Sequence, residues 1–473
     1  MSAPTTPGAN PLDPAQPVRI HVVGAGGTGM SAIATVLFEM GHHVSGSDLR
    51  DSPTLDRLRA GGVWVEVGHR PGNVGAAQTV VYSTAVPEDN VELVEARRRG
   101  LRVVPRSRVL ADITGLRRSI AIAGTHGKTT TCSMVALTLV EAGARPSFVI
   151  GGDLNEIGAN AVWDNGEWLV IEADESDGSF LELDAEVAVV TSVEPDHLEH
   201  YGGSFAALRR AFAQFVSGGR ASAVLSADDP LCLELAESAR GAVRTFGLSP
   251  DAEYRVSDVE LTRSTSAFEL SRRGQSLGRF TLPIAGEHNV RNAAASIAAS
   301  LETGADVDAA RTALARFAGV ARRFEFRGEA GGVTLIDDYA HLPGEVSAAL
   351  AAARAGGFER VVCAFQPHRF SRTQSLWRDF ADAFVGADVL VVTGIYAAGE
   401  APRPGVSGKL VVDAVLEAHP GAAASYVATR EAVIEHLDST LRPGDVLLTL
   451  GAGDLTSVPD ALLELWSGTA RAG

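Results

Sequence analysis

The stretch from Ser119 to Cys132, SIAIAGTHGKTTTC, limits the possible fold of this chain more than any other. Its apolar run Ile120–Ala123 is typical of a buried strand, and an apolar helix is expected from Lys128 to about Ala142. A glycine-containing loop lies between them. A strand, a glycine loop and a helix start, in this order, direct free backbone N–H groups and the positive end of the helix dipole at one point. The stretch therefore predicts an α/β domain with a phosphate site.

The predicted phosphate site consists of loop and first-turn residues that follow one another: Gly124, Thr125, His126, Gly127, Lys128, Thr129 and Thr130. In loops of this kind the lysine contacts the β- and γ-phosphates, and the next hydroxyl binds Mg²⁺. Ile122 stands where the usual G-x-x-x-x-G-K-[ST] pattern has its first glycine, so the loop is a shortened variant. The alternative is a glycine-rich turn before an ordinary core helix.

The rarity of lysine favours the phosphate site over that alternative. Of the 41 basic residues, only Lys128 and Lys409 are lysines. The chain uses arginine wherever a surface cation suffices, yet it has lysine where a compact ammonium has to fit among phosphates. We therefore predict that Lys128 binds the phosphates of a nucleoside triphosphate.

Length and charge narrow the class of protein. A chain of 473 residues is too long for one domain, and two to four are expected. A formal net charge of −17, without a basic tail, argues against a nucleic-acid partner. Cys132, Cys232 and Cys363 lie far apart in apolar settings, which indicates reduced thiols and a cytoplasmic protein.

Neither membrane insertion nor secretion is expected from the sequence. No apolar run reaches the length of a membrane span, and the N-terminus lacks the features of a signal peptide. Residues 1–17 contain five prolines and few apolar residues, so we predict a disordered lead-in.

A second glycine loop follows the apolar strand Val18–Val23. Gly24, Gly26, Gly27 and Gly29 belong to a G-x-G-x-x-G pattern, and Asp48 follows the next predicted strand. This is the dinucleotide-binding fingerprint, so a nicotinamide dehydrogenase is one interpretation. The pattern alone does not decide, because any nucleotide diphosphate suits such a loop. The βα repeats end after about 95 residues, and the chain passes directly to the Ile120 strand.

Three further segments bring polar groups to the predicted triphosphate domain. EADESD, which begins at Glu172, follows a strand and resembles a Mg²⁺ site, although a solvated acidic turn is about as compatible. EPDHLEH contains His197 and His200 among acids, which indicates either a metal or acid–base cluster or a helix cap. Asn289 and Asn292 share one helical face and suit an adenine edge, unless they are ordinary first-turn residues. Segment 250–285 predicts antiparallel hairpins beside the main sheet.

The pattern starts again near residues 322–327 with a third α/β domain. Its strands end in DDYAH, QPHRFSR, GIYAAGE and GAGD, so polar or glycine residues gather at the carboxyl edge of a parallel sheet. The predicted fold is α/β with three domains. They are a Rossmann-like domain at 18–115, a P-loop ATPase-like domain at 116–325 and a second Rossmann-like domain at 326–473.

Together these segments resemble the Mur ligases, the ATP-dependent amide ligases of peptidoglycan synthesis. GTHGKTTT, EADESD, EPDHLEHY, HNVRNA, DDYAH, FQPHRFSRT and YAAGE occur in the order of that family, and the likeness covers about residues 18 to 460. The resemblance implies an enzyme that joins L-alanine to the muramic carboxylate of UDP-N-acetylmuramate. It also implies an acyl phosphate intermediate, ADP and phosphate as products, and domains that close over the substrates.

The resemblance also implies roles for individual residues. The UDP-sugar set is Gly24, Gly26, Gly27, Gly29, Asp48, His69, Ser83 and Thr84, and the Mg²⁺ set is Thr129, Glu172 and His197. Asn289, Asn292 and Asp338 join the phosphate loop in binding ATP. Tyr339, His341, Arg369 and Arg372 are expected to face the alanine. Lys128, Glu172, His197 and His341 are the expected catalytic residues.

Two positions depart from the family pattern. Leu342 stands where DDYAHHP has its second histidine, and Glu199 stands where DHxDxY has aspartate. The alternatives are a recycling ligase that attaches a murein peptide to the same sugar nucleotide, a nicotinamide dehydrogenase, and a non-catalytic UDP-sugar sensor. The sequence leaves a monomer and a homodimer equally open.

Overall fold

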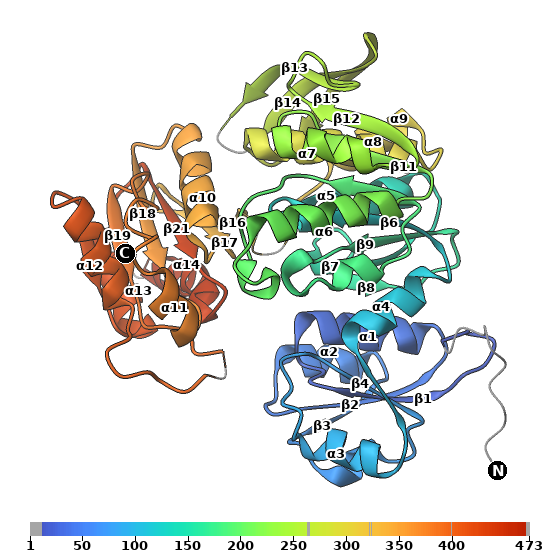
Figure 1. Ribbon diagram of the computed structural model, residues 1–473. Coiled ribbons are helices and arrows are strands. Elements are labelled where there is room, and N and C mark those ends of the chain that lie inside the picture. The colour runs from blue at the N-terminus through green and yellow to red at the C-terminus, as the bar shows by residue number, and fades with distance from the viewer. Residues whose placement is uncertain (1–11, 263–264, 321, 323, 399, 470–473) are drawn as a thin grey trace. The chain divides into compact units, whose positions relative to one another are not determined.

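The computed structural model describes residues 12–262, 265–320, 322, 324–398 and 400–469. The chain forms two compact units, one built mainly from residues up to 318 and the other mainly from residue 319 onward. The short segments 260–262, 265–266 and 283–286 belong to the second unit. The first unit contains two sheets and the second unit contains one, each combined with helices (Figure 1).

The first sheet is parallel and has the strand order β3-β2-β1-β4-β5. Its strands are β1 (Arg19–Val23), β2 (His43–Asp48), β3 (Trp64–Val67), β4 (Thr79–Tyr82) and β5 (Arg102–Pro105). Its helices are α1 (Thr28–Glu39), α2 (Pro53–Ala60), η1 (Pro71–Val74), α3 (Val91–Arg98) and α4 (Arg106–Thr114). The strand order reverses beside β1, which places the glycine loop after β1 at a topological switch point.

The second sheet has the strand order β15-β14-β13-β12-β11-β10-β6-β9-β7-β8. Its central part comprises β6 (Arg118–Ala123), β7 (Ser147–Leu154), β8 (Ala159–Val162), β9 (Trp168–Glu172), β10 (Val187–Val190), β11 (Ser222–Ser226) and β12 (Ala242–Gly247). Strands β6, β9, β10, β11 and β12 run parallel, so their carboxyl ends meet at one edge.

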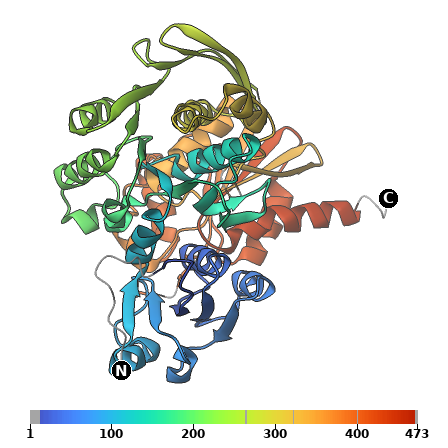
Figure 2. The ribbon, with the colours of Figure 1, turned by 90° about the vertical axis from the view of Figure 1, so that its right-hand side faces the viewer.

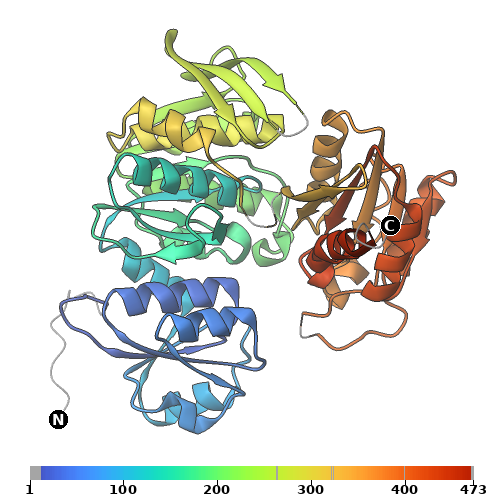
Figure 3. The same cartoon turned by 180° about the vertical axis from the view of Figure 1, so that it is seen from behind.

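The second sheet is combined with helices and short turns. They are α5 (Lys128–Glu141), α6 (Phe205–Gly218), α7 (Pro230–Glu234), α8 (Glu287–Leu301) and α9 (Val307–Ala315), with short turns η2 (Glu175–Asp177), η3 (Ser179–Glu182), η4 (Leu198–Tyr201) and η5 (Leu235–Ser238). Almost every residue of α5 from Thr129 to Leu139 is buried, because the sheet and helix α8 cover it on different sides. Figure 3 shows α5 and α8 side by side.

The strands predicted in segment 250–285 do not lie beside the main sheet but extend it. Strand β13 (Tyr254–Leu261) pairs in parallel with β12, and β14 (Ser266–Arg272) and β15 (Gln275–Leu282) continue the order outward. Arg273 and Gly274, which join β14 to β15, both have positive φ angles of 49° and 80°. That backbone suits a tight hairpin turn. The alternating pattern thus identified the strands but not their attachment to the sheet.

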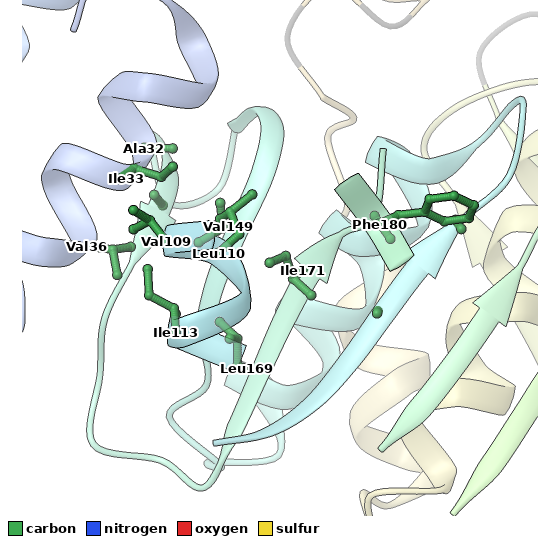
Figure 4. Close-up of a cluster of buried hydrophobic side chains, with 14 of the residues drawn as sticks. Ala32, Ile33, Val36, Val109, Leu110, Ile113, Val149, Leu169, Ile171 and Phe180 are labelled. Carbon is green, nitrogen blue, oxygen red and sulfur yellow. The ribbon is translucent and has the colours of Figure 1, made fainter. Parts of the chain in front are cut away.

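One hydrophobic core joins the two sheets of the first unit. Ala32, Ile33 and Val36 of α1 lie in a cluster with Val109 of α4 and Val149 of β7 (Figure 4). Helix α1 also packs on β8, where the Asn160 amide donates to the carbonyl oxygen of Thr28 at 3.3 Å. The helix that begins at the first glycine loop is therefore fixed to the sheet that carries the second.

The second unit contains the third sheet, with the strand order β16-β17-β21-β18-β19-β20. Its strands are β16 (Glu325–Ala330), β17 (Val333–Asp338), β18 (Arg360–Phe365), β19 (Val389–Val392), β20 (Ala424–Tyr426) and β21 (Asp445–Leu450). Its helices are α10 (Pro343–Ala355), α11 (Phe370–Leu376), α12 (Lys409–Ala418), α13 (Arg430–Thr440), η6 (Asp454–Ser457) and α14 (Val458–Thr469), the last of which leads to the C-terminal end in Figure 2. Strand β16 is antiparallel to β17, and the others are parallel.

The predicted α/β fold with three domains is confirmed, whereas their proposed boundaries at 115 and 325 stay predictions. The predicted disordered lead-in, residues 1–17, is wrong at Leu12, because this side chain is buried in the core and its carbonyl oxygen lies 3.3 Å from His42 Nε2. Its first part, residues 1–11, lies outside the described residues. Among the helices that the structure describes, none is long and apolar enough to cross a bilayer.

Candidate active site

The loop between β6 and α5 has the backbone that its glycines allow. Gly124 has φ 133° and Gly127, directly before the helix, has φ 81°, both in the region that favours glycine. The segment after β10 holds the loop, because the N–H of Thr125 donates to Ser192 O and that of His126 to Ser192 Oγ, each at 3.0 Å. The remaining amides of the loop and of the start of α5 can bind an anion.

Lys128 extends from the start of α5 to the acidic segment after β9. Its Nζ donates to Glu175 Oε1 at 2.9 Å and to the carbonyl oxygen of Gly124 at 2.7 Å. Burial lowers the pKa of Lys128, but the carboxylates of Glu175, Asp174 and Glu172 outweigh it and raise the pKa overall. The ammonium is therefore charged at neutral pH and is held at the loop. Glu175 was part of the predicted acidic segment, but its ion pair with Lys128 could not be derived from spacing.

Thr129 and Glu172 form the second contact between the loop and the acidic segment. The hydroxyl of Thr129 donates to Glu172 Oε1 at 3.1 Å, and Glu172 Oε2 accepts from the N–H of Gly151 at 2.7 Å. A hydroxyl and a carboxylate are oxygen donors of the kind that Mg²⁺ takes, and Mg²⁺ commonly completes its shell with water and substrate phosphates. These two residues therefore fit the predicted metal site.

The predicted third ligand, His197, is not joined to that pair. His197 has φ 52° and precedes η4, with its Nε2 3.6 Å from Asp196 Oδ2. Within the described chain, no hydrogen bond or ion pair joins His197 to Thr129 or Glu172. No three His, Cys, Asp or Glu side chains of the described residues form a group that could hold a metal ion. The segment is nevertheless tied to the site, because the hydroxyl of Tyr201 donates to the carbonyl oxygen of Glu175 at 2.6 Å.

Asn289 and Asn292 lie on one face of α8, which packs on α5. Both are buried, with exposed fractions of 5% and 8%. A Cβ atom at Gly127 would collide with the amide oxygen of Asn292. The structure thus places Asn292 directly against the phosphate loop, while the assignment of both residues to adenine stays a prediction.

The first glycine loop is held by Asp48 at the end of β2. The N–H of Gly26 donates to Asp48 Oδ2 at 2.9 Å, and a Cβ at Gly26 would lie 2.8 Å from the same oxygen. The dinucleotide fingerprint assigns this carboxylate to a ribose, whereas here it binds the loop itself. The turn after β4 closes nearby, where Val86 N–H donates to Ser83 O at 2.9 Å and Val86 packs beside Gly24. Thr84 lies within that turn.

His69 belongs to a buried polar network that sequence reasoning missed. Glu92 of α3 has an exposed fraction of 0% and binds His21, Ser47 and His69, with Ser47 Oγ donating at 2.5 Å and His69 Nδ1 at 3.3 Å. Burial raises the pKa of Glu92, but hydrogen bonds from His21 and Ser47 outweigh it and lower the pKa to about 2. A charged, buried Glu92 therefore orients His69. No local pattern in the sequence indicated this network, because Glu92 is 71 positions from His21 and 23 from His69.

In the second unit, the side chains predicted to bind an amino acid come together after β17 and β18. The ring centroids of Tyr339 and His341 are 5.4 Å apart, and those of His341 and His368 are 5.5 Å apart. Arg372 Nη1 lies 3.1 Å from His368 Nδ1, and Arg369 N–H donates to Tyr396 O at 2.8 Å. A guanidinium can only donate, so this ring nitrogen accepts. His368 is a further residue that the sequence analysis did not single out, although it lies within FQPHRFSRT.

Asp338, predicted to bind ATP, has both carboxylate oxygens engaged by the backbone. Its Oδ2 accepts from Phe324 N at 2.6 Å and its Oδ1 from Ala340 N at 2.7 Å. His341 lies 3.3 Å from Glu345, which also accepts from the N–H of Leu342 at 3.1 Å. Leu342, at the departure from the family pattern, is buried. In this unit Asp338 and Glu345 thus fix the loop that carries Tyr339 and His341.

Models of one protein family match three consecutive parts of the chain. Residues 19–118 match the Mur ligase family catalytic domain, residues 122–300 the Mur ligase middle domain, and residues 322–453 the Mur ligase glutamate ligase domain. The UDP-N-acetylmuramate–L-alanine ligase of Geobacter sulfurreducens is 45% identical over 94% of this chain and 97% of its own length. That of Rubrobacter xylanophilus is 46% identical over 94% and 99%.

A solved structure shows the same relationship in three dimensions. The UDP-N-acetylmuramate–alanine ligase of Thermotoga maritima superposes with a TM-score of 0.82, at 30% identity, and covers 96% of this chain and 100% of its own. The murein peptide ligase of Psychrobacter arcticus has the same fold, with a TM-score of 0.70, 23% identity, and coverage of 94% of this chain and 98% of its own. Three family models that together match most of the chain, and relatives at 45–46% identity, show that the chain belongs to the Mur ligase family.

Proposed function

We propose that the protein is the ATP-dependent ligase that joins L-alanine to the muramic carboxylate of UDP-N-acetylmuramate, in peptidoglycan precursor synthesis. The observation that carries the proposal is the pairing of Lys128 with the acidic segment after β9, on a chain that is 45% identical to relatives named for this reaction. A phosphate loop with a charged lysine serves phosphoryl transfer, and the relatives' names supply the two substrates to be joined.

The chemistry requires an activated carboxylate, because hydroxide is a poor leaving group and a carboxylate does not condense with an amine in water. ATP transfers its γ-phosphoryl group to the muramic carboxylate, which gives an acyl phosphate and ADP. The amine of alanine then attacks the acyl carbon, and phosphate leaves. Lys128 and the amides of the loop stabilise the charge that develops during phosphoryl transfer.

Mg²⁺ is the cofactor that this donor set favours. Thr129 and Glu172 are in contact and would hold the ion together with the phosphates, with His197 as the third proposed ligand. When bound, Mg²⁺ neutralises phosphate charge during transfer. The support for this assignment is the oxygen donor pair beside the loop.

The remaining sets bind the two substrates that are joined. We assign the UDP-sugar to the first glycine loop with Asp48, His69 and the turn at Ser83 and Thr84. The alanine is assigned to Tyr339, His341, Arg369 and Arg372, because two arginines beside aromatic rings suit a carboxylate. We further propose a cytoplasmic protein, where ATP and sugar nucleotides are available, present as a monomer or a homodimer.

The proposal is tested by measuring phosphate release with ATP, Mg²⁺ and UDP-N-acetylmuramate against L-alanine, glycine, L-serine and a murein tripeptide. We expect turnover with L-alanine, and one amide product that contains the amino acid should form for each ADP released. Turnover with the tripeptide in place of L-alanine would make the protein a recycling ligase. NADH oxidation without phosphate release would contradict the ligase assignment altogether.

A further inference from the structure

Arg106 is a cation at the carboxyl edge of the first sheet to which the proposed function gives no role. It begins α4 directly after β5, in the parallel sheet where β1 ends in the first glycine loop. Because carboxyl ends of parallel strands share one edge, Arg106 and the loop lie on the same side of the sheet.

The guanidinium of Arg106 lies against Gly29, the last glycine of the G-x-G-x-x-G pattern. A Cβ at Gly29 would be 2.9 Å from Cζ and 3.0 Å from Nη1 of Arg106. Gly29 lies in the first turn of α1 and is not among the glycines with positive φ, so any residue could adopt its backbone. The space beside Gly29 is filled by the Arg106 guanidinium, which a larger side chain at this position would have to displace.

Arg106 is half-buried, yet its guanidinium has no ion pair with any residue that the structure describes. Its neighbours differ, since Arg102 and Arg108 both pair with Asp112, at 3.0 Å and 2.9 Å. A half-buried arginine without an ion pair, placed against the glycine loop, is available to a ligand anion.

The glycine loop itself needs a positive partner for a diphosphate. Helix α1 follows Gly27 without a side-chain cap and has no acidic residue in its first turn, so its N-terminus is open to an anion. Asp48, however, occupies the N–H of Gly26 and adds a negative charge beside the loop. A cation at Gly29 offsets that charge.

We propose that Arg106 binds the diphosphate of the UDP-sugar and determines the specificity of the first glycine loop for a doubly charged nucleotide. This inference rests on the proposed function, because it names how the sugar nucleotide is recognised. The planar guanidinium offers a fork of N–H donors to two phosphate oxygens, a geometry that lysine does not reproduce. Because Arg106 lies against Gly29, changes at the two residues should affect diphosphate binding through the same interaction.

The test is isothermal titration calorimetry of the full chain with UDP, UDP-N-acetylmuramate and ATP. Arg106→Ala should bind both UDP and UDP-N-acetylmuramate about 10- to 100-fold more weakly, while ATP affinity changes less than about twofold. Arg106→Lys should recover only part of the loss. Arg108→Ala, on the same helix, is the matched control and should bind all three ligands as the unchanged protein does, because Asp112 keeps Arg102.

A second variant tests the contact with the loop. Gly29→Ala should displace the guanidinium and weaken UDP binding, and adding Arg106→Ala to it should cost little more, since both changes remove one interaction. Retained ATP affinity shows that the first unit is folded. Fully additive losses of UDP affinity in the double variant would contradict the proposed coupling between Gly29 and Arg106.

The outcomes separate this inference from the proposed function. Unchanged UDP affinity in Arg106→Ala, or a loss confined to UDP-N-acetylmuramate, would overturn the diphosphate assignment, and the second result would move Arg106 to the muramic carboxylate. If the unchanged protein bound neither UDP nor UDP-N-acetylmuramate, the proposed function itself would fail.

Discussion

The ammonium nitrogen of Lys128 lies 2.9 Å from Oε1 of Glu175, across the phosphate loop from the end of β9. One of the two lysines in the chain is thereby held by a carboxylate whose other oxygen, Oε2, is buried without a hydrogen-bond partner in the described structure. Burial raises the pKa of Glu175 more than Lys128 lowers it. The pair keeps the cation at the loop before a phosphate arrives.

Replacement of this lysine by arginine should nearly abolish activity although charge is conserved. The pocket between Gly124 O and Glu175 fits a compact ammonium, and the broader guanidinium does not reproduce its contacts. We expect Lys128→Arg to lower kcat by about 100-fold or more, the usual effect of losing one preorganised electrostatic group. UDP-N-acetylmuramate binding, measured by calorimetry, should be unchanged. A near-normal kcat would show that the phosphate site is misassigned.

Alanine at Gly127 should impair ATP binding because of the contact with Asn292, and a second glycine with a similar backbone angle serves as the control. Gly127→Ala needs a left-handed backbone and also drives a Cβ into Asn292, so the KM for ATP should rise at least about tenfold. Gly143, just beyond the end of the same helix, has φ 71°, and no atom lies within 4 Å of the place that a Cβ would take there. Gly143→Ala should therefore cost about 1 kcal/mol of stability and leave the KM for ATP unchanged. Equal effects of the two changes on that KM would contradict the contact with Asn292.

Protonation of Glu92 at low pH should lower the stability of the first sheet. Its pKa of about 2 in the folded protein lies below the ordinary 4.5, so its contribution to stability is present above about pH 4.5 and is lost as the pH falls toward 2. The shift corresponds to about 3 kcal/mol at neutral pH. Glu92→Gln should reduce the protection of β1 and β4 in amide hydrogen exchange at pH 7, and much less at pH 3. Glu88→Gln, exposed and before the same helix, is the control. A pH-independent difference would reject this role of Glu92.

Arg372 should bind the carboxylate of alanine and so determine the affinity of the protein for this substrate. Burial lowers the pKa of His368, and electrostatic interactions with His341 and Arg372 lower it further, to about 3. The ring is therefore neutral at pH 7 and accepts from Arg372. Arg372→Ala should raise the KM for alanine by about 30-fold or more and leave that for ATP nearly intact, as expected for a lost charged hydrogen bond of about 2–5 kcal/mol. Arg369→Ala should act in the same direction. The exposed Arg378, changed to alanine, should leave the KM for alanine unaltered.

Activity should not depend on dissolved CO₂ or bicarbonate. A carbamylated lysine requires an amine near the metal, and residues 198–230 contain no lysine. The remaining lysine, Lys409, forms an exposed ion pair with Asp413 at 2.6 Å on α12 of the second unit. Assays in degassed and bicarbonate-supplemented buffer should give equal rates, and Lys409→Arg should match the unchanged protein. If the rate depended on bicarbonate and Lys409→Arg removed this dependence, a carbamylated lysine would take part in the reaction, which would contradict the prediction.

The sequence by itself determined the three α/β domains and the edge of each sheet at which the candidate site residues gather. Strand, glycine loop and helix start are local patterns, because hydrophobic periodicity and the conformational freedom of glycine act within a few residues. For that reason GTHGKTTT placed Lys128 at a helix start, and HNVRN placed Asn289 and Asn292 on one face of α8.

Only the tertiary structure decided which of these residues meet. The contact of Lys128 with Glu175 joins positions 47 residues apart, and that of Glu92 with His21 joins positions 71 apart. Such partners depend on strand order and on which helices pack together, and neither leaves a periodic signal in the chain. The same holds for Leu12, whose apolar contact anchors a proline-rich segment that composition alone would leave unfolded. It holds as well for Arg106, whose position against Gly29 follows from a parallel sheet that brings the ends of β1 and β5 to one edge.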